Sequence, residues 1–110
     1  MTSVKFLADQ KGIYGFEISG HSSFDCDDEF GKIVCSAVSS AAYMAANTIT
    51  DIIGDKADVE VDEALMCLKV KNPCDKTLAV LDGLSLHLTE LSKQYSNNIR
   101  IYGGAKHVKD

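Results

Sequence analysis

A long helical pattern begins at residues 31–39, which read Gly-Lys-Ile-Val-Cys-Ser-Ala-Val-Ser. The other predicted elements are expected to pack against this helix. Small and apolar residues recur there in steps of three and four, which predicts a helix from about Lys32 to Ile53 with Gly54 as its C-terminal cap. The expected buried stripe is Val34, Val38, Ala41, Ala45, Thr48 and Ile52. Ser19-Gly20-His21 closes a strand pattern, and an acidic loop over residues 22–30 joins it to the helix.

The segments around this stretch predict two hairpins and a second helix. Alternating apolar residues indicate strands near residues 4–8, 14–18, 58–62 and 66–70, with Tyr14, Phe16 and Ile18 on one face. Asp75 is expected to cap a helix whose apolar stripe runs from Leu78 to Tyr95, and residues 99–101 could add a last strand. The order ββαββα, with a possible C-terminal strand, predicts an α+β two-layer sandwich. Its sheet of four or five strands is mostly antiparallel.

Composition sets the broad class. The chain has 110 residues, which suits a single domain over 1–110, and 45% of them are hydrophobic. Eleven basic residues against sixteen acidic ones give a net charge of -5, which argues against direct nucleic-acid binding and favours a basic peptide as partner. No continuous apolar run suggests a membrane span, and the first residues lack the apolar core of a signal peptide. We therefore expect a cytoplasmic protein.

Among the four cysteines, Cys35 stands out because the predicted helix places it in the first turn. A helix N-terminus and a nearby imidazole both favour the thiolate. His21 ends the preceding strand, so a folded-back loop would bring the two side chains together as a nucleophile and its general base. First-turn amides would stabilise the oxyanion, and Ser39, four residues on, would share the face of Cys35.

Simpler interpretations compete with this dyad. A cysteine in an apolar helix is more often a core residue, and a histidine at a strand end is more often a surface residue. Cys67 and Cys74 are expected to be structural and Cys26 a bystander, while His87 and His107 have no evident partner. No cysteine pair has zinc-ribbon or thioredoxin spacing, so we expect no metal and no cofactor.

The order of elements and two motifs together resemble a known family. Ser19-Gly20-His21 followed by Gly31-x-Ile33-Val34-Cys35-x-Ala37-Val38-Ser39 is similar to the ribosomal-processing cysteine proteases (Prp, YsxB-like) over essentially the whole chain. The resemblance implies that Cys35 is the nucleophile and His21 the general base and acid. Supporting roles then fall to Ser39, Gly20 and Gly31, and a substrate-covering loop contains Ser22, Asp25, Asp28 and Phe30.

The resemblance also implies a substrate and an assembly. Members of the family remove an N-terminal extension from the bacterial large-subunit ribosomal protein L-twenty-seven, a basic partner, and form homodimers. The apolar residues Met44 and Leu86 lie off the helical stripes and indicate either an oligomer interface or, as is more frequent, incidental surface residues.

The chain departs from the family pattern at Lys32, where the family has an aspartate. Asp28 or Glu29 could take over the role of that aspartate. Alternatively, the chain is a catalytically impaired homologue that still binds the ribosomal protein. A less favoured alternative is a metal-binding or redox-sensing module that uses His21, Cys26 and Cys35.

Overall fold

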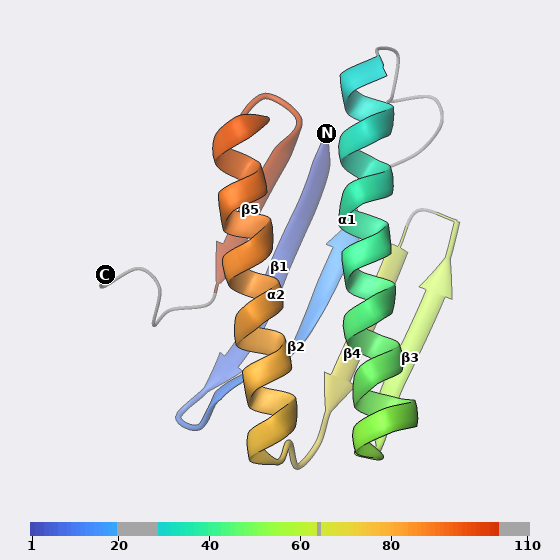
Figure 1. Cartoon of the computed structure of the whole chain (residues 1–110), viewed down its shortest axis with the longest axis vertical. Coiled ribbons are helices and arrows are strands. Elements are labelled where there is room, and N and C mark those ends of the chain that lie inside the picture. The colour runs from blue at the N-terminus through green and yellow to red at the C-terminus, as the bar shows by residue number, and fades with distance from the viewer. Residues whose placement is uncertain (20–28, 64, 104–110) are drawn as a thin grey trace.

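The computed structural model describes residues 1–19, 29–63 and 65–103, which form one layer of helices on one sheet (Figure 1). The predicted α+β sandwich is confirmed. The elements, in chain order, are β1 (Thr2–Asp9), β2 (Gly12–Ser19), α1 (Glu29–Asn47), η1 (Thr48–Ile53), β3 (Ala57–Asp62), β4 (Leu65–Val70), α2 (Asp75–Gln94) and β5 (Ile99–Gly103).

The sheet has five strands in the order β3-β4-β2-β1-β5. All neighbours run antiparallel except β1 and β5, which are parallel, so the possible C-terminal strand is present at one edge. Both helices lie on the same face of this sheet (Figure 1). The first residues of β1, the last residues of β2 and the β3–β4 turn meet at one end of the sheet, where Ser19 pairs with both Ser3 and Leu65.

The first hairpin contains an irregularity that the alternating pattern did not predict. Leu7 pairs with Gly15 but Ala8 pairs with Ile13, so Tyr14 is the extra residue of a β-bulge. A bulge shifts the alternation of side chains by one position. Ile13 is therefore fully buried and Tyr14 only half-buried, which corrects the expectation that Tyr14 shares the inner face with Phe16 and Ile18.

The first helix starts three residues earlier than predicted and ends as a π-helix. The helix α1 begins at Glu29, and η1 continues it to Ile53. The i→i+5 bonds of a π-helix widen the turn and rotate the side chains that follow. Ile49 is consequently buried and Ile53 packs against the core, while Ile52, predicted to be inside, is 79% exposed.

Gly54 ends this helix as predicted, with φ of 88° and its N–H donating to the Ile49 carbonyl. Within the described parts of the chain, residues 29–53 are the one helical stretch long and apolar enough to cross a membrane. Its inner side packs in the core of the domain, which accounts for its apolar character.

The start of α2 is held by a residue from the loop that follows η1. Cys74, not Asp75, is the N-cap, and its own side chain makes no capping bond. Asp55 supplies the cap instead: one of its carboxylate oxygens accepts hydrogen bonds from the Cys74 N–H (3.0 Å) and the Thr77 hydroxyl (2.6 Å). These two bonds hold the pKa of Asp55 below its usual value, the Thr77 bond contributing most. The expected cap at Asp75 is therefore wrong, and a distant carboxylate fixes α2 to the end of η1.

Candidate active site

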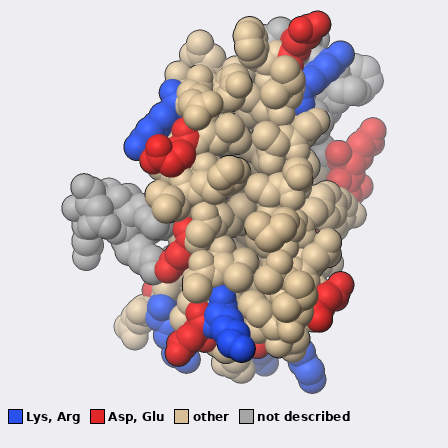
Figure 2. All heavy atoms as spheres, in the orientation of Figure 1, with Lys and Arg blue, Asp and Glu red and all other residues tan. Residues whose placement is uncertain are grey.

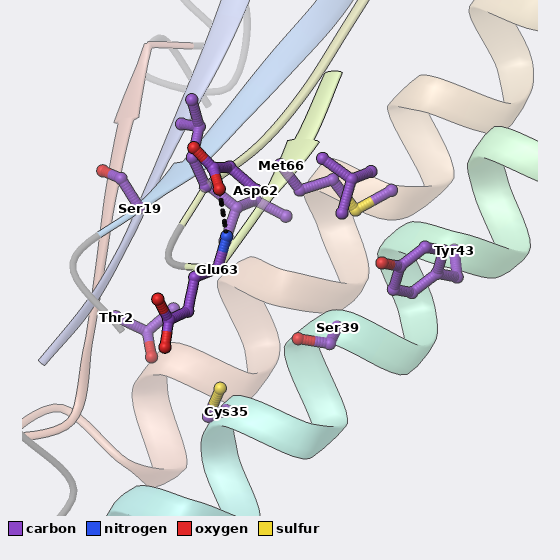
Figure 3. A pocket seen from close by; sticks show the side chains of 11 residues that line it. Thr2, Ser19, Cys35, Ser39, Tyr43, Asp62, Glu63 and Met66 are labelled. Carbon is purple, nitrogen blue, oxygen red and sulfur yellow. Dashed lines mark hydrogen bonds between the residues drawn. The ribbon is translucent and has the colours of Figure 1, made fainter. Parts of the chain in front are cut away.

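A small pocket lies at the end of the sheet where β1 begins, β2 ends and the β3–β4 hairpin turns. Its volume is about 120 Å³. One side is formed by α1 and the other by the strand ends (Figure 3). The lining residues are Thr2, Ile18, Ser19, Cys35, Ser39, Tyr43, Val61, Asp62, Glu63, Leu65 and Met66.

Cys35 and Ser39 line this pocket from one face of α1, one helical turn apart (Figure 3). Cys35 is 6% exposed, so its sulfur is reached through the pocket rather than from the open surface. The side chain at i+4 on a helix lies beside that at i, which is why the predicted pairing on one face is observed. The pocket distinguishes Cys35 from a cysteine enclosed in the core.

The predicted position of Cys35 in the first turn is wrong. Because α1 begins at Glu29, Cys35 is in the second turn. The free N–H groups of a helix belong to its first four residues, and the dipole effect fades within the first turn. Those amides therefore do not lie beside the Cys35 thiol, and the expected oxyanion site at the helix start does not follow from this geometry.

The cysteine that does lie at a helix N-terminus is Cys74, although this position was predicted for Cys35. Cys74 is the N-cap of α2, and its N–H donates to Asp55. The Asp55 carboxylate accepts the hydrogen bond of the Cys74 N–H and places a negative charge beside this helix start. Cys67 is half-buried on β4, where burial, and then the charge of Glu17, raises the pKa of its thiol. Neither thiol lines the pocket of Cys35.

Several predicted site residues lie outside the described part of the chain. These are His21, Gly20, Ser22, Asp25, Asp28 and Cys26. Gly31 and Phe30, expected at the end of the loop, are instead in the first turn of α1. The ring of Phe30 lies 6.2 Å from that of Tyr95 at the end of α2, and Phe30 does not line the Cys35 pocket.

Lys32, which stands where the family has an aspartate, is exposed on α1. Lys32 and Glu29 both lie on the outer surface, and neither lines the pocket. The replacement of the missing aspartate by Asp28 or Glu29 stays a prediction, because Asp28 and His21 lie outside the described residues. No group of three or more His, Cys, Asp or Glu side chains within the described residues could hold a metal ion.

The pattern analysis missed the acidic wall of the pocket. Asp62 and Glu63 line it from the β3–β4 turn. The Asp62 side chain accepts a hydrogen bond from the Glu63 N–H (2.7 Å), which orders the turn. The sequence signal was the run Asp62-Glu63-Ala64, read only as a turn because nothing in it indicated that the turn would face the helix carrying Cys35.

Comparison with known proteins identifies the family of the chain. The profile of the cysteine protease family Prp matches residues 1–100. The chain belongs to the Prp family of cysteine proteases. The ribosomal processing cysteine protease Prp of Bacillus subtilis (strain 168) is 25% identical to it over 83% of this chain and 86% of that protein.

Solved structures share the fold. The Prp protease of Staphylococcus aureus in complex with a substrate peptide superposes with a TM-score of 0.84 at 18% identity, over 94% of this chain and 100% of that one. The same protease with a covalently linked product peptide gives 0.79 at 20% identity, over 93% and 98% of the two chains. The Prp family supplies the cysteine-protease chemistry, and within the described pocket Cys35 is the one cysteine.

Proposed function

We propose that this protein is a cytoplasmic endopeptidase that removes the N-terminal extension of ribosomal protein L-twenty-seven, with Cys35 as nucleophile and His21 as general base and acid. The observation that carries the proposal is the placement of Cys35 at a pocket of about 120 Å³ in a chain of the Prp family. The B. subtilis relative is a ribosomal processing protease, which supports this substrate class. The net charge of -5 suits a basic ribosomal protein as substrate.

The proposed reaction has two stages. His21 takes the thiol proton, and the Cys35 sulfur attacks the scissile carbonyl carbon, forming a C–S bond and a tetrahedral oxyanion. The intermediate collapses as the C–N bond breaks, and the His21 imidazolium gives its proton to the leaving amine. A water molecule, deprotonated by His21, then attacks the thioester, and the C–S bond breaks to release the carboxylate and regenerate the thiolate.

The described residues support part of this scheme. Cys35 presents its sulfur to the pocket, and Ser39 adds a hydroxyl one turn along the same helix face (Figure 3). Tyr43, Val61 and Met66 add apolar surface to the pocket.

The test is cleavage of the extended precursor by the purified protein, with the new N-terminus read by mass spectrometry. We expect one cleavage that yields the mature N-terminus, and we expect His21→Ala to lower kcat/KM by at least about a hundredfold. Wild-type protein that leaves the precursor intact, while folded by circular dichroism, would contradict the substrate assignment. Full activity of the His21→Ala variant would contradict the dyad.

We also propose that the protein acts as a homodimer through its helical face. The centre of that face lacks charged side chains, which collect around its edges (Figure 2). A groove of about 640 Å³ lies between α1 and α2 and is lined in part by Met44, which is 63% exposed. Leu86 on α2 does not line the groove but is also exposed, at 58%. Light scattering should give the mass of a dimer for the wild-type protein and of a monomer for Met44→Glu; a monomeric wild type would exclude the interface.

A further inference from the structure

The side chain of Glu63 occupies a position that the proposed chemistry does not use. It extends from the β3–β4 turn toward Thr2 and Cys35, across the pocket from Ser39 (Figure 3). Its carboxylate has no hydrogen bond and no ion pair with any residue in the described ranges, and it is exposed. The neighbouring Asp62 differs, because one of its carboxylate oxygens accepts the Glu63 N–H and serves the turn itself.

The described lining of the pocket offers Glu63 no compensating positive charge. No lysine, arginine or histidine is among the described residues that line the pocket. A carboxylate that faces a cysteine nucleophile opposes, by like-charge repulsion, the stabilisation that the proposed His21 imidazolium gives the thiolate. A substrate cation bound at the carboxylate would remove this penalty in the complex. A negative charge at this point is thus a disadvantage for the free protein and an advantage once a basic substrate has bound.

We propose that Glu63 is a specificity-determining residue that pairs with a lysine or arginine of the substrate near the scissile bond. This inference rests on the proposed peptidase activity at Cys35. Both residues line one small pocket, and an extended peptide advances about 3.4 Å per residue, so the selected side chain lies within about three residues of the cleaved bond. Such a pair fixes the position of the peptide on the enzyme and rejects acidic sequences.

The hairpin offers a matched control. Glu60 is an exposed glutamate on β3, three residues before Glu63. It pairs with Cys67 across the hairpin, whereas the neighbouring pair Val61 and Met66 lines the pocket, so Glu60 lies on the opposite face. E63K and E60K therefore change the net charge equally on the same hairpin, and only E63K changes the charge at the pocket.

The test measures kcat/KM for wild type, E63Q, E63K and E60K. The substrates are the precursor peptide and analogues in which each basic residue near the cleaved bond is replaced by glutamine or glutamate. We expect E63K to lower kcat/KM on the parent peptide about tenfold, E63Q a few-fold, and E60K less than about twofold. One glutamate analogue should be cleaved better by E63K than by wild type. Equal behaviour of E63K and E60K on every peptide would overturn the inference.

A cleavage profile on a mixed peptide library separates this inference from the proposed ribosomal substrate. If wild type ignores the ribosomal precursor but cleaves library peptides with a basic preference that E63K abolishes, the substrate assignment fails and the role of Glu63 stands. If wild type cleaves the precursor but E63K has the same library profile as wild type, the ribosomal substrate stands and the role of Glu63 fails. Absence of all cleavage by folded wild-type protein would contradict both proposals.

Discussion

The two helices of this domain each begin close to a cysteine, and the two helix starts are built for different tasks. Cys74 is the N-cap of α2, exposed, with its N–H bonded to Asp55. Cys35 lies in the second turn of α1, nearly buried, with its side chain at a pocket. Cys74 is therefore the cysteine closer to a helix N-terminus, whereas Cys35 is the one that lines the candidate pocket.

This difference shows what a helix start can and cannot indicate about a cysteine. The dipole and free amides act only at the first turn, and at α2 a carboxylate is already placed there. The pocket beside Cys35 is formed by strand ends that are distant from it in the sequence. Cys74 is exposed and does not line this pocket. The candidate nucleophile is therefore distinguished from Cys74 by tertiary structure.

Replacing each of the two cysteines by alanine gives the largest expected contrast. Cys35→Ala should lower kcat/KM on the extended precursor by at least about a thousandfold, since Cys35 is the one thiol among the described residues that line the pocket. Cys74→Ala should leave it within about twofold of wild type, because the change lies at an exposed site outside the pocket. Circular dichroism checks that both variants fold. Comparable losses in the two variants would remove the distinction between the helix starts.

Alkylation should distinguish the same thiols in the unmodified protein. An ordinary cysteine thiol has a pKa near 8.5, and only its thiolate reacts with iodoacetamide. We expect Cys35 to react about tenfold faster than Cys74 near pH 6.5, although Cys74 is the more exposed. Peptide mapping after timed quenching gives each rate separately. Faster labelling of Cys74 at that pH would mean that Cys35 is not activated.

The contacts at the start of α2 should affect stability but not catalysis. Thr77 is fully buried and its hydroxyl donates to Asp55, so Thr77→Val should lower the free energy of unfolding by about 1–2 kcal/mol. Thr89→Val, on the same helix but half-buried and without a hydroxyl bond to the described residues, is the control and should cost less. Urea unfolding measures the stabilities, and cleavage of the precursor should be unchanged in both variants.

The pH dependence of that loss identifies its cause. Hydrogen bonding lowers the pKa of Asp55 in the folded protein from the usual 3.8. A lowered carboxyl pKa stabilises the fold above the unfolded-state value, and this stabilisation is lost as pH falls through the folded value. The difference between wild type and Thr77→Val should therefore be full near neutral pH and shrink below about pH 4. A difference that does not change with pH would mean that packing, and not the bond to Asp55, is responsible.

Much of the fold could be predicted from the sequence because its strands and helices have strong apolar periods. Local sequence patterns alone predict the two hairpins, both helices and the cap at Gly54. The bulge at Tyr14 and the π-helix at the end of α1 could not be predicted, since each shifts the pattern by one residue for reasons of packing. The cap of α2 was missed because Asp55 lies about twenty positions before the helix that it holds.

The candidate site was predictable to a different degree. Cys35 and Ser39 were found because a helix face and a family motif are both local in the sequence. Glu63 was not found, because its place beside Cys35 depends on how the second hairpin pairs with β2. His21 remains a prediction, since it lies outside the described residues.

The smallest expected effect is that of Ile52→Ala in the π-helical end of the first helix, and Ile49→Ala in the same segment is its buried comparison. The apolar stripe favoured Ile52 as a core residue, but the π-helix leaves it 79% exposed and buries Ile49. Ile52→Ala should change the free energy of unfolding by less than about 0.5 kcal/mol, whereas Ile49→Ala should lower it by about 2–4 kcal/mol. Urea unfolding at a fixed low protein concentration provides the comparison. Equal losses at the two positions would mean that the helix continues with α-helical register to its end, and that Asp55 then reaches the start of α2 by another geometry.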